Sequence, residues 1–90
     1  MVKSIKDFLD GENYGQYIKE FSENLLLIKV SDLPITLKVC YDPNISLYRV
    51  EEKWHTGSDI EISEWTFTEE QTKFECLELI EEFLSINKVY

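Results

Sequence analysis

The fold is decided by a run of alternating residues, ITLKVCY at positions 35–41. Apolar Ile35, Leu37 and Val39 alternate with polar or small residues, which is the pattern of a β-strand with one buried face. Three further strands are expected around it, at residues 25–30, 45–54 and 59–67. Turn-forming residues separate the four strands at 31–34, 42–44 and 56–58. The sequence therefore predicts an antiparallel four-stranded meander.

The turn at residues 56–58 predicts how the last two strands pair. Folding about it places four pairs opposite each other: Trp54 and Ile60, Glu52 and Ile62, Lys53 and Glu61, and Arg49 and Trp65. Folding about Pro43 adds two pairs: Val39 and Tyr48, and Leu37 and Val50. One face of the sheet then collects Leu37, Val39, Tyr48, Val50, Trp54, Ile60 and Ile62. The other face is solvated and carries Trp65 together with Arg49 and Lys53. Glu52 falls on the apolar face, where a bulge or an edge position would accommodate it.

The N-terminal residues 4–21 predict two short helices. Ser4 is the expected N-cap of the first helix, whose apolar face is Ile5, Phe8 and Leu9. The apolar face of the second is formed by Tyr14, Tyr17, Ile18 and Phe21. On one continuous helix, at about 100° per residue, these faces would point in opposite directions. We therefore expect a break at residues 10–13, with Asn13 as the second cap. The alternative is one helix buried on two sides, which Gly11 and Gly15 disfavour.

A third helix is expected at the C-terminal end. Thr68 and Gln71 match a capping box, so the helix should begin there and run to about Asn87. Its predicted central apolar stripe is Phe74, Leu77, Ile80 and Leu84, and its apolar arc is widened by Cys76, Leu79, Phe83 and Ile86. We expect the sheet to cover this wide arc together with either the N-terminal helices or another subunit. The predicted fold class is α+β, in a single domain of residues 1–90, with the helices packed mainly on one face of the sheet.

The composition limits the classes of partner. The chain has 18 acidic and 9 basic side chains, a net charge of −9, and 43% hydrophobic residues. Such an acidic globular protein is not expected to bind nucleic acid or an anionic membrane directly. Alanine is absent and Arg49 is the only arginine, which indicates an AT-rich genome, such as that of a low-GC bacterium, its phage or a plasmid. The N-terminal residues do not match a signal peptide, so we expect a cytoplasmic protein with Cys40 and Cys76 reduced.

Catalytic motifs are not found in the sequence. It contains neither a glycine-rich phosphate loop nor a nucleophile elbow. The only histidine, His55, is predicted opposite Asp59, where it could act as a general base or be a solvated turn residue. We favour the solvated residue, and we expect a non-catalytic protein without a cofactor or a metal site.

The acidic residues are concentrated in the second half of the chain. Residues 1–50 carry seven acids and six bases, whereas residues 51–82 carry eleven acids and two bases. Glu75, Glu78 and Glu82 have helical spacing, which sets such carboxylates about 5–6 Å apart, similar to phosphates along a nucleic-acid strand. These acids could therefore act as a DNA mimic toward a basic groove, or they could be a solvated face that keeps the protein in solution.

Trp65 is the second feature that suggests a partner. On the solvated face, beside Arg49 and Lys53, it could anchor a partner protein. The structural alternatives are a cation–π contact with Arg49 or burial under the end of the chain. The predicted partner-binding residues are thus Glu75, Glu78, Glu82, Trp65, Arg49 and Lys53.

These features predict a non-catalytic, acidic protein-binding module. In size, acidity and codon usage the chain is similar in kind to phage-encoded inhibitors of nucleic-acid enzymes and to bacterial immunity proteins, although no motif is shared. We expect it to inhibit a basic protein that handles nucleic acid. The alternative is a small accessory or assembly protein that acts as a homodimer through Leu79 and Ile86 of the last helix.

Overall fold

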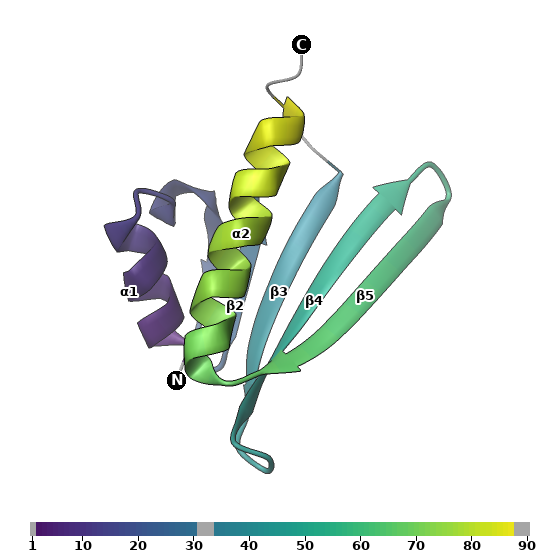
Figure 1. Ribbon diagram of the computed structural model, residues 1–90. Coiled ribbons are helices and arrows are strands. Elements are labelled where there is room, and N and C mark those ends of the chain that lie inside the picture. Colours follow the sequence, from purple (N-terminus) through teal and green to yellow (C-terminus); the bar gives the residue numbers. More distant parts are fainter. Residues whose placement is uncertain (1, 31–33, 88–90) are drawn as a thin grey trace.

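The computed structural model describes residues 2–30 and 34–87, with the side chains of Thr56 and Asn87 excepted. The elements are α1 (Lys3–Gly11), the 3₁₀ helix η1 (Gly15–Tyr17), β1 (Ile18–Phe21), β2 (Leu25–Lys29), β3 (Ile35–Asp42), β4 (Leu47–Thr56), β5 (Asp59–Phe67) and α2 (Glu69–Asn87). The fold is α+β: both α-helices lie on the same side of one antiparallel sheet (Figure 1). We call the sheet face toward the helices the inner face and the other the open face.

The core lies between the inner face and the two α-helices. Leu26, Leu37 and Val50 are buried on neighbouring strands, and Ile5 of α1 and Ile80 of α2 cover them. Fully burying a side chain of this kind contributes about 1.5–3 kcal/mol to folding. This shared core holds α2 across the middle of the sheet, whereas the β4–β5 hairpin extends beyond the helix layer (Figure 1).

The sheet has five strands in the order β1-β2-β3-β4-β5, not the predicted four. The prediction of a second N-terminal helix was wrong, because only Gly15–Tyr17 is helical. The chain then continues as β1, which pairs with β2 and places Ile18 opposite Ile28. Aromatic and β-branched residues suit a strand, and the available edge of β2 provides its hydrogen bonds. The predicted break between the two N-terminal segments is present.

Asn13 ends α1 instead of capping a second helix. Its φ of 68° is left-handed, and the N–H groups of Asn13 and Tyr14 donate to the carbonyls of Asp10 and Leu9, at 3.1 and 2.9 Å. This pair of bonds is a Schellman motif, in which asparagine is a common substitute for glycine.

The β3–β4 pairing is offset by two residues from the prediction. Val39 lies opposite Val50, and Leu37 lies opposite Glu52. The turn is longer than expected, because residues 43–46 separate the strands and the side chain of Asp42 accepts a bond from the backbone of Asn44. A shift of two residues leaves every side chain on its predicted face.

The β4–β5 pairing is offset by one residue, and this error has a larger consequence. The turn contains two residues, not three: Thr56 pairs with Asp59, and Gly57 occupies a left-handed conformation with φ of 64°. Trp54 consequently lies opposite Glu61, where Ile60 was predicted. A shift of one residue moves every side chain of β5 to the other face.

The capping box of α2 is confirmed, but its predicted core stripe is only partly correct, because Ile80 is buried whereas Leu77 and Leu84 are only partly buried. Gln71 donates its backbone N–H to the Thr68 hydroxyl at 3.3 Å, and Thr68 donates its own to the Gln71 side chain at 3.0 Å. The buried residues are Thr72, Cys76, Leu79, Ile80 and Phe83. Phe74, predicted as core, is 54% exposed and packs edge-on against Phe8 of α1. The centre of the stripe is rotated because α2 lies on the sheet and meets α1 only along its side.

Candidate functional site

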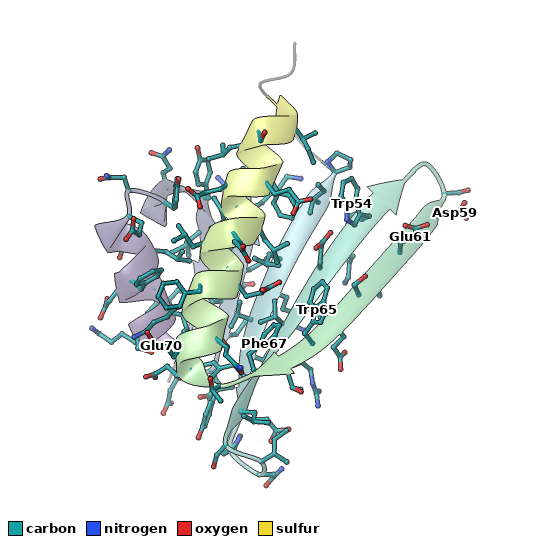
Figure 2. The ribbon with its side chains drawn as sticks, viewed as in Figure 1. Trp54, Asp59, Glu61, Trp65, Phe67 and Glu70 are labelled. Carbon is teal, nitrogen blue, oxygen red and sulfur yellow. The ribbon has the colours of Figure 1, made fainter. Side chains whose placement is uncertain are left out.

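The inner face of the β4–β5 hairpin extends beyond α2. Trp65 lies opposite the buried Val50, so Trp65 points to the helix side, as do Glu61 and Asp59 at the alternate positions (Figure 2). Trp65 is half-buried, whereas Glu61 and Asp59 are exposed. The helix layer therefore covers the base of the hairpin and leaves its outer part open.

Trp54 is the second tryptophan on this face. Its ring packs edge-on against Phe83 of α2, with centroids 6.5 Å apart. Its indole N–H donates to the carboxylate of Glu52, two residues earlier on the same strand. Glu52 thus faces inward within a regular strand, and the bulge or edge position that its sequence context suggested is not found there.

Three acids of α2 lie along the flank that faces the hairpin. Glu75 is half-buried, and Glu78 and Glu82 are exposed. Burial raises the pKa of the Glu75 carboxyl, and the charges of Glu78, Glu52 and Glu82 raise it further. The acids of the helix and of the sheet are therefore close enough to repel one another.

These residues make up one surface, which we call the acidic aromatic surface. Its members are Glu52, Trp54, Asp59, Glu61, Trp65, Glu75, Glu78 and Glu82. Within the described part of the chain, the inner positions of β4 and β5 and this flank of α2 contain no lysine or arginine. The surface consequently combines exposed negative charge with two aromatic rings.

Glu69, at the start of α2, contrasts with Glu75. Its carboxylate accepts hydrogen bonds from the hydroxyls of Ser4, at 2.8 Å, and Tyr48, at 3.0 Å. These two bonds lower the pKa of Glu69. Ser4 therefore joins α1 to α2 and is not the predicted N-cap, a position that Val2 occupies without a side-chain bond. Glu69 is thus held by two hydroxyl donors, whereas the Glu75 carboxyl lies close to the charges of Glu78, Glu52 and Glu82.

The structure separates the predicted partner-binding residues into two groups. Glu75, Glu78 and Glu82 are brought onto the same side of the sheet as Trp65, a grouping that the sequence did not predict. Arg49 and Lys53 point to the open face, so the expected cluster of Trp65 with these two bases was wrong, as was the cation–π alternative.

On the open face, by contrast, an arginine lies close to two acidic side chains. Arg49 lies 3.7 Å from Asp42 and 3.4 Å from Glu64. Lys53 lies opposite Ile62, which was predicted for the core and is 57% exposed.

Sequence reasoning missed four members of the surface, namely Glu52, Trp54, Asp59 and Glu61. The available signal was the dipeptide Gly57-Ser58, which suits a two-residue hairpin turn. With that turn, Glu61 falls opposite Trp54 and Trp65 opposite Val50.

The titratable groups elsewhere offer little chemistry. His55 is exposed and lies opposite Ile60, not the predicted Asp59. Cys40 and Cys76 are free, and burial raises the pKa of Cys76 to about 12, so its thiol stays protonated. Across residues 2–30 and 34–87, no group of three or more His, Cys, Asp or Glu side chains could hold a metal ion, and no helix is long and apolar enough to cross a membrane.

A small open pocket of about 240 Å³ lies on another side of α2. It is lined by Tyr14, Glu81, Leu84 and Ser85. Burial and the charge of Glu81 raise the pKa of the Tyr14 phenol, which therefore remains protonated. The lining contains neither histidine nor lysine, so it does not provide the usual base for a serine nucleophile.

Comparisons of the chain with models of protein families, with curated proteins and with solved structures find no match.

Proposed function

We propose that the chain is a non-catalytic binding module whose acidic aromatic surface binds a basic protein. The observation that carries this proposal is the combination of clustered carboxylates and two tryptophans on one exposed surface with no base in it. A basic partner that handles nucleic acid would be blocked, because the carboxylates occupy the groove that phosphates otherwise occupy.

The charges favour a basic partner. Burial raises the pKa of Glu75, and repulsion from the charges of Glu78, Glu52 and Glu82 raises it further in the free protein. A lysine or arginine placed between them removes this repulsion and gains charge-assisted hydrogen bonds. Long-range attraction between the two proteins also speeds their association.

The aromatic rings favour a protein partner over small counterions, which the carboxylates alone would attract. Trp54 and Trp65 are half-buried and supported by Phe83 and Val50, so both rings are held in place. Tryptophan is enriched among the residues that contribute most to protein interfaces. Its face also attracts the guanidinium of arginine through a cation–π contact.

The homodimer was suggested by the wide apolar arc of α2, and the burial of that arc within one chain does not support it. Leu79 is only 8% exposed, because the sheet and α1 cover most of the apolar arc of α2 within one chain. Ile86 remains 37% exposed. A sedimentation measurement of the mass in solution tests this alternative.

The proposal is tested by affinity capture from a nuclease-treated lysate of the source cell. The bait is the wild-type chain or the variant E75Q/E78Q/E82Q. The matched control is E12Q/E20Q/E23Q, which removes the same charge at exposed positions outside α2 and outside the β4–β5 hairpin.

We expect the wild type and the control to capture one basic nucleic-acid-handling protein, and the α2 variant to capture much less. Added nucleic acid should displace the chain from that protein. Equal capture by the two triple variants, or capture of no such protein, would contradict the proposal.

A further inference from the structure

The outer edge of β5 has no partner strand within the described chain. β5 is the last strand in the sheet, nine residues long, and pairs only with β4. Alternate backbone N–H and C=O groups of such a strand point outward, ready to pair with another chain. The other edge strand, β1, has four residues and an irregular register, which is the usual protection of an edge.

The side chains of β5 alternate between two kinds of surface. Asp59, Glu61 and Trp65 belong to the acidic aromatic surface on the inner side. Ile60 and Ile62 are on the open side and are 59% and 57% exposed, the two highest values among the large apolar residues of the described chain. A strand added beside residues 59–62 would therefore have acids along its inner face and Ile60 and Ile62 along its open face, where Glu64 follows them.

We infer that the free edge of β5 binds an extended segment of the basic partner as a sixth strand, in which lysine or arginine alternates with apolar residues. This inference rests on the proposed function and specifies how the partner is recognised. The basic side chains contact Asp59 and Glu61 and reach toward Trp65, while the apolar ones pack on Ile60 and Ile62. Backbone hydrogen bonds to the edge provide affinity, and the alternation provides specificity.

A second copy of the chain is a poorer occupant of this edge. β5 carries three acids and no base, so pairing two copies edge to edge would bring six acidic side chains together. Like charges on paired strands destabilise a sheet, whereas a basic strand gains from the same charges.

The test uses two synthetic peptides of the same length as β5 and of equal composition. In one, lysine and valine alternate, and in the other they occur in pairs, which places valine on both faces of a strand. Binding to the full chain is measured by titration calorimetry, and the backbone amides of β5 are followed by NMR hydrogen exchange. We expect the alternating peptide to bind about tenfold more tightly and to slow exchange at the β5 amides.

The variant I60T/I62T keeps the charge and the β-branched shape of both residues. It should lose this preference for alternation, whereas the matched variant Ile45→Thr, at an exposed loop isoleucine, should keep it. Equal binding of the two peptides, with no change at the β5 amides, overturns the edge inference but leaves the proposed function, which the capture experiment decides. No binding of either peptide, or slow exchange at β5 in a self-associated free protein, also overturns the inference.

Discussion

The two faces of the β4–β5 hairpin differ in how their charges are partnered. On the open face Arg49 lies near both Asp42 and Glu64. On the inner face Glu52 has the acid Glu75 of α2 nearby, and the described inner positions of the hairpin contain no base. Balanced surface charges contribute little to stability, and they gain little from a new partner. The unbalanced face is the one that a basic partner would stabilise most.

The largest expected effect comes from removing the support of the inner face. We expect Phe83→Ala to lower the free energy of unfolding by about 3–5 kcal/mol, because its ring is buried and packs against Trp54. Urea denaturation measures this loss. The control is Phe74→Ala on the same helix, which should cost less than about 1.5 kcal/mol because its ring is mostly exposed. Similar losses in the two variants would show that the core stripe of α2 is not as described.

The next effect separates a partnered acid from the acidic aromatic surface. Replacing Glu69 by Gln should lower the free energy of unfolding by about 0.5–1 kcal/mol at neutral pH, because two bonds to a charged acceptor are weakened. The pKa of Glu69 is lowered in the folded state, so its contribution is present above the unfolded pKa of 4.5 and is lost as the pH falls through the folded pKa. Urea denaturation at neutral and acidic pH should therefore show the difference only at neutral pH.

Glu75 should respond with the opposite sign. Its pKa is raised in the folded state, so stability is greatest with the carboxyl protonated and falls as the pH rises from 4.5 through the folded pKa. Replacing Glu75 by Gln removes the charge and should raise the free energy of unfolding at neutral pH by about 0.3 kcal/mol. The gain should vanish below pH 4.5. A loss of stability at neutral pH would mean that Glu75 is favourably partnered.

The smallest effect is expected on the open face. Arg49→Gln and Lys53→Gln should each change the free energy of unfolding by less than about 0.5 kcal/mol, because both side chains are at least partly exposed. Neither variant should slow association with a captured basic partner, because each removes a positive charge. Slower association, measured by surface plasmon resonance, would show that Arg49 and Lys53 contribute to partner binding.

The elements that the sequence predicted correctly are those specified by a local pattern of residues. The alternation in residues 35–41 and the capping box at Thr68 are local patterns, and both correspond to elements of the structure. The segment 18–21 became a strand because β2 offered an edge, which no local pattern reveals.

The register of β5 was ambiguous because its two faces both carry apolar residues. Ile60 and Ile62 are on one face, and Trp65 and Phe67 are on the other. The position of α2 decides between them: Phe67 lies near the start of the helix and Trp65 follows farther along β5, whereas the turn between β4 and β5 lies beyond the helix (Figures 1 and 2). The two aromatic rings bury more apolar area than two isoleucines, so they take the covered face. The candidate site follows from this choice, which depends on tertiary packing.

The most direct test of the acidic aromatic surface is the rate of association with the captured partner, measured between about 50 and 500 mM salt. The wild type is compared with E75Q/E78Q/E82Q and with the open-face variant D42N/E51Q/E64Q, which removes the same charge. We predict that the α2 variant associates several-fold more slowly at low salt and that its rate approaches the wild-type rate at high salt, while the open-face variant stays close to the wild type throughout. Equal rates for the wild type and the α2 variant at every salt concentration would show that these acids are only a solvated face.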